Sequence, residues 1–229
     1  QHTLCFMIAL SKHFPQMTRA LLEGRYNDRT SLMGRDLTGR ALGIIGFGKI
    51  GRRVGQIAHQ AFRMNVLYHD IVSAPAEVEA SAGARQVSME ELLRTAEYVT
   101  LHVPLDKSTR GMIGPNQLNL MGAQTILINT CRGPVVDEKA VAVALDSGSL
   151  WGYAADVFTI EPPEADHPLI GRPDVLLTPH SAAQTVESLI NMATGVAQDV
   201  IGVLRGQAPL NPVNDPELVR INRDRLGKP

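Results

Sequence analysis

The feature that most constrains the fold of this chain is an alternation of short apolar segments with helical ones. Apolar, β-branched and aromatic residues are concentrated in six segments that we expect to be strands, at 41–46, 65–70, 98–104, 124–130, 151–158 and 174–180. Helical spacing of apolar residues lies between them, most clearly over 50–61, 89–96 and 137–148. Strands separated by helices pair in parallel through right-handed crossovers, with helices on both faces. The sequence therefore predicts an α/β fold, a doubly wound parallel sheet of the Rossmann type.

The other segments are predicted to be flanking helices, loops and a tail. One helix is expected at about 3–22, before the first strand, and a long one at about 182–204, after the last strand. Gly, Pro, Asp and Ser gather in three segments that we expect to be loops, at 24–40, 71–86 and 159–173. After about Arg205 the chain is rich in Pro, Asn and charged residues, and we expect this tail to lie over the surface or to lack regular structure.

Composition excludes several classes of partner. The chain has 229 residues, of which 44% are hydrophobic, and a formal net charge of −1. No basic stripe indicates nucleic acid, and no apolar run has the length of a membrane span. Two cysteines, Cys5 and Cys131, indicate no disulfide framework, so a reducing, cytoplasmic compartment is expected. Because Gln1 is followed at once by an apolar helical stretch, we expect the sequence to start partway through a larger protein.

Three glycines follow the first predicted strand at fixed spacing. In "LGIIGFGKIG", Gly46, Gly48 and Gly51 form the pattern G-x-G-x-x-G between a strand and a helix. The first glycine permits a sharp turn, the second lets the backbone approach a pyrophosphate, and the third lets the helix pack close to the strand. The helix N-terminus then offers free N–H groups and a partial positive charge to phosphates. The pattern predicts a dinucleotide-binding loop.

Asp70, at the end of the second predicted strand, indicates which dinucleotide binds. It lies about 20 residues after the glycines, where a carboxylate accepts hydrogen bonds from the adenosine ribose hydroxyls. A negative charge there would repel a 2′-phosphate, so NAD(H) is favoured over NADP(H). The alternative is that Asp70 is an ordinary turn residue at a strand end.

Three later strand ends place chemically capable side chains at one edge of the sheet. Arg132 follows the fourth predicted strand, Asp156 and Glu161 follow the fifth, and His180 follows the sixth. Ligands of open α/β sheets bind at these carboxyl ends. Arginine suits a carboxylate, histidine exchanges protons near neutral pH, and an acid beside it would stabilise the imidazolium and orient the ring. Taken singly, three of these residues also fit structural roles: Arg132 fits an ion-pair residue, Glu161 a solvated loop residue, and His180 a hydrogen-bonded loop residue.

Other reactive side chains are given structural roles. Cys131, next to Arg132, is expected to line the pocket and is not assigned a nucleophilic role. No Cys/His cluster has metal-ligand spacing, so no metal site is predicted. The remaining interior histidines are predicted to be packing, strand-end or surface residues: His59, His69, His102 and His167.

Five motifs, in this order, resemble the D-isomer-specific 2-hydroxyacid dehydrogenases: GIIGFGKIG, HVPLDKSTRGMIG, NTCRGPVVDE, DVFTIEP and TPHSA. The resemblance extends from His2 to about Leu210. It implies an NAD-dependent oxidoreductase that transfers a hydride between NAD(H) and C2 of a small D-2-hydroxy or 2-oxo acid. By match of motif, Arg132 binds the substrate carboxylate and keto oxygen, and His180 is the general acid/base, paired with Glu161.

The resemblance also assigns contacts on the adenosine and phosphate side of the coenzyme. Lys49 and Ile50 are expected to offer backbone groups to the pyrophosphate, and Thr109 to lie close to the phosphates. Val103 and Pro104 are expected to line the adenosine side.

On the nicotinamide side, the resemblance assigns Thr130 to the ribose and Asp156 to the carboxamide. The backbone around Ser181 to Ala183 is expected to complete the pocket. Together the expected cofactor-binding residues are Gly46, Gly48, Lys49, Ile50, Gly51, Asp70, Val103, Pro104, Thr109, Thr130, Asp156, His180, Ser181, Ala182 and Ala183.

The family pattern further implies a domain organisation and a partner. Residues 1–24 would be a linking helix from a substrate domain that is mostly absent, 25–181 the NAD-binding Rossmann domain, and 182–229 a helix and tail returning to the substrate domain. A homodimer is implied. Without the missing part we expect residues 1–229 to bind NADH but to turn over poorly. The sequence resembles glyoxylate/hydroxypyruvate reductases and phosphoglycerate dehydrogenases equally, and an NAD(H)-sensing corepressor on the same scaffold is the alternative function.

Overall fold

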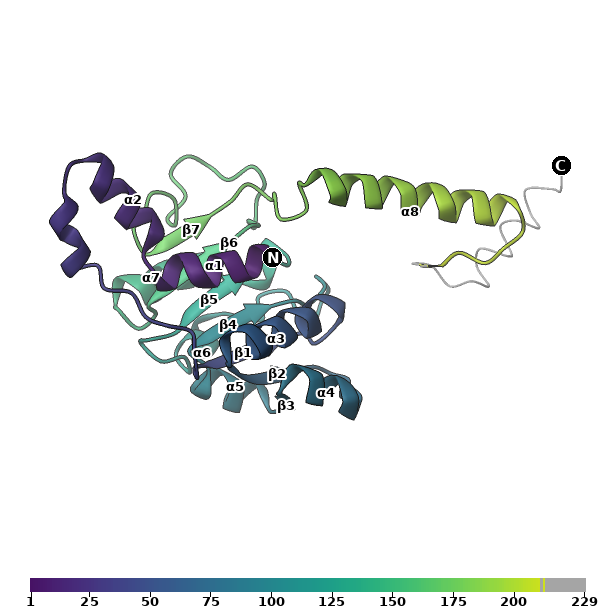
Figure 1. Ribbon diagram of the computed structural model, residues 1–229, viewed down its shortest axis with the longest axis horizontal. Helices are drawn as coiled ribbons and strands as arrows, with labels where there is room; N and C mark the ends of the chain where they lie inside the picture. Colours follow the sequence, from purple (N-terminus) through teal and green to yellow (C-terminus); the bar gives the residue numbers. More distant parts are fainter. Residues whose placement is uncertain (211, 213–229) are drawn as a thin grey trace. The chain divides into compact units, whose positions relative to one another are not determined.

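The computed structural model describes residues 1–210 and residue 212 of the chain (Figure 1). Two compact units make up the chain, Gln1–Ala182 and Ala183–Pro229. The first unit contains the whole sheet and all of its covering helices. Most of the tail predicted after Arg205, namely residue 211 and residues 213–229, lies outside the described residues.

A seven-stranded parallel sheet forms the centre of the first unit. Its strands are β1 (Ala41–Ile45), β2 (Asn65–His69), β3 (Ala84–Gln86), β4 (Tyr98–Leu101), β5 (Ile126–Asn129), β6 (Gly152–Ala155) and β7 (Val175–Leu177). Their spatial order is β3-β2-β1-β4-β5-β6-β7, and every neighbouring pair is parallel. The order reverses between β1 and β4, which is where open α/β sheets bind ligands. The predicted doubly wound fold is confirmed.

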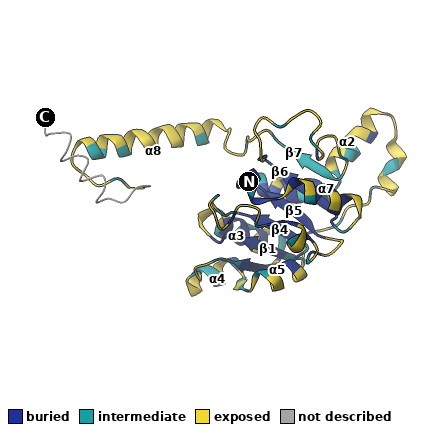
Figure 2. Cartoon of the chain, turned by 180° about the vertical axis from the view of Figure 1, so that it is seen from behind, coloured by how far each residue is buried: buried dark blue, intermediate teal, exposed yellow. Residues whose placement is uncertain are grey.

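Helices cover both faces of this sheet. One face carries α1 (His2–Ser11), α3 (Lys49–Phe62) and α4 (Ala76–Ala82), and the other carries α5 (Met89–Thr95), α6 (Pro115–Leu118) and α7 (Glu138–Asp146). Successive strand residues point to opposite faces, so each strand contributes to two apolar cores. In β5, Ile126 and Ile128 pack with Met7 of α1, whereas Leu127 packs with Val141 of α7. The strands accordingly lie in the most buried part of the unit (Figure 2).

The helix predicted at 3–22 is two helices in the structure. After α1 the chain turns at His13, whose φ is 51°, and α2 (Phe14–Leu22) begins with Pro15 in its first turn. Proline is favoured in a first turn and excluded from a helix interior, because it lacks an N–H group and clashes with the preceding turn. Pro15 therefore marks the boundary that apolar spacing alone did not show.

Two of the predicted loops contain regular structure. The segment 71–86 holds α4 and the edge strand β3, and the segment 24–40 holds a short 3₁₀ helix, Tyr26–Thr30. Each of these elements is seven residues long or shorter, so none carries enough residues for a periodic pattern to emerge.

The helix expected from residue 182 starts four residues later in the second unit, as α8 (Val186–Leu204). Thr185 caps it, since its side-chain oxygen accepts a hydrogen bond from the Ser188 amide at 3.1 Å.

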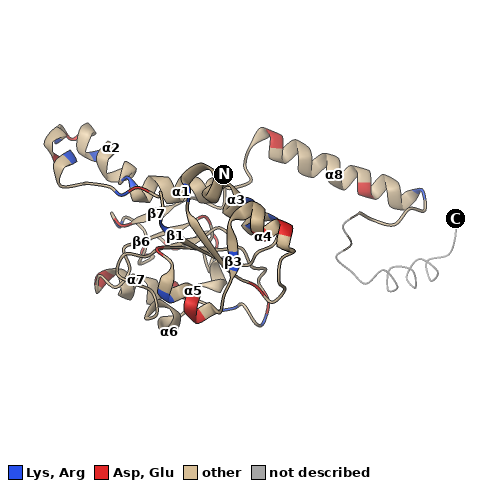
Figure 3. Ribbon diagram, turned by 60° about the horizontal axis from the view of Figure 1, so that its bottom comes forward, with Lys and Arg blue, Asp and Glu red and all other residues tan. Residues whose placement is uncertain are grey.

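Among the described residues, Arg85 in the edge strand β3 is the only charged side chain in a strand, and the others lie in helices and loops (Figure 3). Both signs are interspersed over these elements, in keeping with the net charge of −1. Within the described part of the chain, no helix has both the length and the apolar character needed to cross a membrane.

Candidate active site

The glycine loop between β1 and α3 has the geometry that a phosphate-binding turn requires. Gly46 has φ 91°, in the region that favours glycine, and a Cβ there would lie 2.6 Å from the carbonyl oxygen of His102. A Cβ on Gly51 would lie 2.2 Å from the carbonyl oxygen of Gly46. The turn and the close packing of α3 on the sheet therefore both exclude side chains at these two positions.

Gly48 differs from Gly46 and Gly51, because neither its backbone conformation nor its neighbours in the protein require glycine at this position. A Cβ there would meet no atom within 4 Å, and its backbone has φ −76°, which any residue adopts. Gly48 is the N-cap of α3, no side chain caps that helix, and Lys49 and Ile50 form its first turn. The open space lies beside uncapped helix N–H groups, so the residues present fit a pyrophosphate.

Asp70 follows β2 directly and lies against the same turn. Its Oδ2 accepts a hydrogen bond from the Phe47 amide at 2.6 Å, and its Oδ1 accepts one from the Val72 amide at 3.1 Å. The carboxylate thus lies beside the glycine loop and orders that loop, and its contact with the ribose hydroxyls stays a prediction. A carboxylate has about four acceptor positions, which leaves capacity for ribose hydroxyls.

Across the switch point, the loop after β4 carries the residues assigned to the adenosine side. Val103 is half-buried, Pro104 is exposed, and Thr109 is buried. The Thr109 hydroxyl donates to the Pro104 carbonyl at 2.7 Å and accepts from the Asp106 amide at 2.9 Å. Thr109 therefore stabilises this loop, and its contact with a phosphate stays a prediction.

The turn after β5 carries Thr130 and Arg132. The Thr130 hydroxyl is hydrogen-bonded to that of Thr3 in α1 at 3.0 Å. Arg132 is exposed, and its Nη1 donates to the adjacent Cys131 carbonyl at 2.6 Å. Over residues 1–210 and 212 no carboxylate pairs with this guanidinium, so its charge is available to a ligand.

Asp156, directly after β6, is almost fully buried at 1% exposure and holds the turn after β7. Its Oδ1 accepts from the Thr178 hydroxyl at 2.6 Å and the Ser181 amide at 2.7 Å, and its Oδ2 accepts from the Ala182 amide at 2.9 Å. His2 of α1 approaches the same site, with Nε2 2.8 Å from the Thr178 hydroxyl. The sequence did not indicate that Asp156 accepts these hydrogen bonds from the turn after β7. Its contact with the nicotinamide carboxamide stays a prediction.

The turn held by Asp156 presents His180 to Glu161. His180 has φ 51°, and its Nδ1 lies 2.8 Å from Glu161 Oε2. The other oxygen, Oε1, accepts from the Phe158 amide at 3.0 Å. The hydrogen bond from His180 lowers the pKa of Glu161, and the Phe158 amide adds to this against the opposing effect of burial. Since an ionised carboxylate only accepts, Nδ1 carries a proton and Nε2 is left to exchange one.

Arg132 belongs to the same edge of the sheet as this pair. Its neighbour Gly133 packs on the loop that leads to Glu161: a Cβ on Gly133 would lie 1.9 Å from the carbonyl carbon of Phe158. The structure thus joins Glu161 to His180 directly, and brings Arg132 near them through the contact of their loops. Ala183, the last residue of the predicted nicotinamide pocket, begins the second unit.

Two other reactive side chains have buried, structural surroundings. Burial raises the pKa of the Cys131 thiol, whose Sγ lies 3.1 Å from Asn129 Oδ1. Burial lowers the pKa of His102 to about 4, so its ring is neutral at physiological pH. Within the part of the chain that the structure describes, no group of three or more His, Cys, Asp or Glu side chains is arranged to hold a metal ion.

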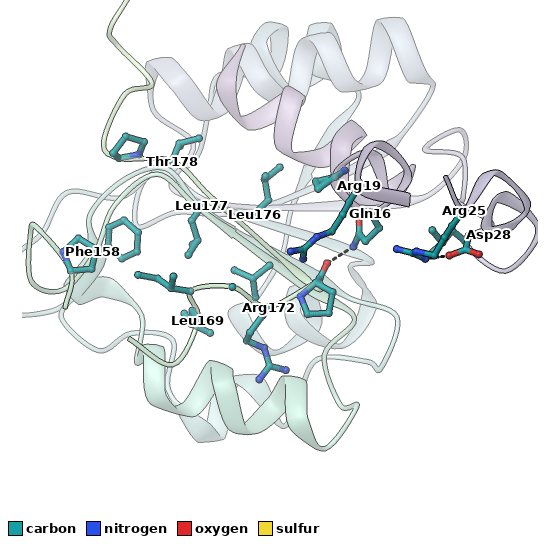
Figure 4. A pocket seen from close by; sticks show the side chains of 18 of the residues that line it. Gln16, Arg19, Arg25, Asp28, Phe158, Leu169, Arg172, Leu176, Leu177 and Thr178 are labelled. Atoms are coloured by element: carbon teal, nitrogen blue, oxygen red, sulfur yellow. Dashed lines mark hydrogen bonds and ion pairs between the residues drawn. The ribbon is translucent and has the colours of Figure 1, made fainter. Parts of the chain in front are cut away.

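A cavity of about 800 Å³ lies beside β7 and not at the glycine loop. α2 and the segment 25–32 form one side of it, and residues 163–179 form the other (Figure 4). Leu169, Leu176 and Leu177 give it apolar walls, and Arg19 and Arg172 stand at its edge. Thr178 and Pro179 also line it, so this groove reaches the back of the His180 turn.

Comparison with known proteins gives these features a context. Residues 4–182 match the family model described as "D-isomer specific 2-hydroxyacid dehydrogenase, NAD binding domain". The chain belongs to this family. Its matched part is therefore an NAD-binding domain, which agrees with the glycine loop and with Asp70.

Relatives of this chain are similar over most of its length. It is 40% identical to a D-3-phosphoglycerate dehydrogenase of Methanocaldococcus jannaschii, over 99% of this chain and 42% of that protein. It is 38% identical to a glyoxylate reductase of Korarchaeum cryptofilum, over 94% of this chain and 65% of that protein. A D-lactate dehydrogenase from Lactobacillus jensenii, solved with NAD+, superposes with a TM-score of 0.84 at 29% identity, covering 93% of this chain and 67% of that one. The chain thus spans about two fifths to two thirds of the length of these proteins.

Proposed function

We propose that the protein containing this chain transfers a hydride between NAD(H) and C2 of a small D-2-hydroxy or 2-oxo acid. The observation that carries the proposal is the Glu161–His180 hydrogen bond at the carboxyl edge of the sheet, beside the loop of Arg132. Family membership supports the reaction class. The names of two relatives, D-3-phosphoglycerate dehydrogenase and glyoxylate reductase, suggest the substrates to test.

When bound, NADH supplies the hydride that the substrate carbon accepts. His180 gives the proton on Nε2 to the oxygen that becomes the hydroxyl, and in the reverse direction takes it back. Glu161 holds the ring through Nδ1 and stabilises the imidazolium, because its carboxylate is ionised at neutral pH. Removing such a general acid is expected to cost about 10²- to 10⁴-fold in rate.

Arg132 is proposed to bind the substrate carboxylate and to offset charge on the reacting oxygen. Its exposure and its lack of a carboxylate partner among the described residues support this role. A guanidinium binds a carboxylate through two parallel hydrogen bonds, so it orients the substrate as well as attracting it. Loss of this donor is expected to cost about 10²- to 10³-fold.

The test is NADH oxidation with glyoxylate, hydroxypyruvate and 3-phosphohydroxypyruvate, using the protein as it occurs, including any segments beyond residues 1–229. His180→Ala and Glu161→Gln should lose most activity and keep NADH affinity. Glu164→Gln is the matched control, because Glu164 lies on the same loop and is exposed like Glu161, but its side chain has no hydrogen bond or ion pair within the described residues. Tight NADH binding with no oxidation of any of these acids would favour the corepressor-type binding protein instead.

The remaining parts of the proposal concern the whole protein. Residues 1–24 and 182–229 are proposed to link the NAD-binding domain, 25–181, to a substrate domain. Since substrate orientation supplies much of the rate, residues 1–229 alone should bind NADH and turn over poorly.

We also propose a homodimer, supported by the exposed apolar residues Phe14, Leu22 and Tyr26 beside the groove at β7. Sedimentation analysis tests the dimer, and localisation of the tagged protein tests the proposed cytoplasmic compartment.

A further inference from the structure

One peptide group lies between the loops that carry the proposed catalytic residues. The Phe158–Thr159 peptide packs on Gly133, next to Arg132, so closely that a Cβ on Gly133 would lie 2.0 Å from the Phe158 oxygen. The Phe158 amide also donates to Glu161 at 3.0 Å. A shift of this peptide would therefore displace both the Arg132 turn and the acid that orients His180.

The carboxylate of Glu138 accepts hydrogen bonds from the N–H group of this peptide. It is the first residue of α7, only 8% exposed, and both of its carboxylate oxygens lie 3.2 Å from the Thr159 amide, which donates to them. Burial of a carboxylate is unfavourable unless hydrogen bonds compensate, and the N-terminus of a helix adds a favourable partial charge. Burial raises the pKa of the nearby Tyr153, and the charge of Glu138 raises it further.

His167 completes the arrangement. The Leu169 amide donates to its Nδ1 at 3.4 Å, so in the neutral ring the proton lies on Nε2, which is 3.5 Å from Glu138 Oε2. The same ring meets the Phe158 ring edge-on, with centroids 5.6 Å apart and an interplanar angle of 88°. His167 thus contacts Glu138 on one side and Phe158, the residue that Glu138 helps to fix, on the other.

We propose that Glu138 and His167 are positioning residues for the reaction: they clamp the Phe158–Thr159 peptide and thereby set Glu161 and Arg132 at the distance that the substrate requires. This rests on the proposed function of Glu161 and Arg132. Neither member of the clamp touches substrate or coenzyme in this role. Their effect should therefore appear in kcat and not in the affinity for NADH.

The test compares variants in the protein as it occurs. Glu138→Ala leaves the Thr159 amide without its acceptor, and a displacement of about 1 Å should lower kcat about 10- to 100-fold while the Kd for NADH changes less than about twofold. Glu138→Gln keeps one acceptor oxygen and should restore kcat to within about threefold of wild type. His167→Phe keeps the edge contact but loses the Nε2 donor, and should lower kcat about two- to tenfold.

Asp137→Ala is the matched control. Asp137 is the N-cap of the same helix and accepts from the Lys139 and Ala140 amides at 3.1 Å, but within the described residues it makes no hydrogen bond to Thr159. Its loss should lower Tm by about 2–4 °C and leave kcat unchanged. Equal losses of kcat in Asp137→Ala and Glu138→Ala would overturn the proposal, since a weakened helix would then explain both.

Amide hydrogen exchange separates this proposal from the proposed function. Exchange at Thr159 should be faster in Glu138→Ala than in wild type, at a temperature where both are folded, and close to wild type in Glu138→Gln and Asp137→Ala. This readout needs no activity, so a wild-type protein without dehydrogenase activity would refute the proposed function and still test the clamp. Unchanged exchange and unchanged kcat in Glu138→Ala would refute the clamp alone.

Discussion

The two glycines Gly48 and Gly51 should respond to the same substitution in opposite ways. Gly48→Ala places a methyl group where no protein atom lies within 4 Å, on a backbone with φ −76°. Alanine is a poorer N-cap than glycine, but it also reduces the entropy of the unfolded chain, and the two effects offset. We expect the free energy of unfolding to change by less than about 1 kcal/mol.

Coenzyme binding should change much more. The added methyl group occupies the space beside the first turn of α3, where the pyrophosphate is predicted to lie. A Kd for NADH raised at least tenfold, or about 1.4 kcal/mol, is expected. In Gly51→Ala the methyl group lies 2.2 Å from the Gly46 oxygen, more than 1 Å inside ordinary contact, so the turn must move. Overpacking of this kind costs about 1–3 kcal/mol of stability.

Fluorescence titration with NADH and thermal unfolding of each variant make the comparison. Gly122→Ala is the control, because its Cβ would lie at an ordinary 3.9 Å from Thr125 Oγ1, in the loop that precedes β5. A folded Gly48→Ala protein that binds NADH with the wild-type Kd would refute the placement of the pyrophosphate. A Gly51→Ala protein as stable as wild type would refute the packing argument.

Two further perturbations test the turn that presents the imidazole. Asp156→Asn replaces one carboxylate oxygen with an amide NH2 group, which cannot accept a hydrogen bond from the Ser181 or Ala182 amide. The substitution should cost about 1–3 kcal/mol of stability and lower kcat. Denaturant unfolding and steady-state kinetics measure these two effects. Glu161 has a pKa lowered below its ordinary 4.5, so its contribution to stability is present above that value and is lost as pH falls through the lowered folded pKa. Wild type should therefore lose more stability than Glu161→Gln between about pH 5 and pH 3, by a small amount because the pair is solvent-exposed; parallel pH curves would contradict the pairing with His180.

Apolar patterning was sufficient to predict most of the fold. The six predicted strands are all present, because strands buried on both faces appear in the sequence as continuous apolar runs. The edge strand β3, only three residues long, was missed, since Ala84–Gln86 has one small and two polar residues. The break near His13 was also missed, although Pro15 was a signal for it.

For the candidate site, the sequence indicated which strand ends lie together, but it did not indicate every contact between them. The Glu161–His180 pair and the position of Asp70 beside the glycine loop follow from which strand ends lie together, and parallel topology determines that. The link between Glu138 and Thr159 joins residues 21 apart through a loop whose path no local pattern encodes. The sequence alone shows Glu138 as an acidic residue at the start of the helix predicted over 137–148, and it predicts His167 to be a surface or packing residue.

The hydrogen bond from the Phe47 amide to Asp70, the residue predicted to contact the adenosine ribose, bears on attempts to redesign coenzyme preference. A variant meant to accept a 2′-phosphorylated coenzyme would first replace this carboxylate with a neutral or basic side chain. That replacement would also leave the Phe47 amide, now 2.6 Å from Oδ2, without its acceptor and loosen the turn around the phosphates. Asparagine keeps a carbonyl oxygen for Phe47 while removing the negative charge, so Asp70→Asn, followed by a positive charge introduced nearby, is the order of changes that the geometry favours.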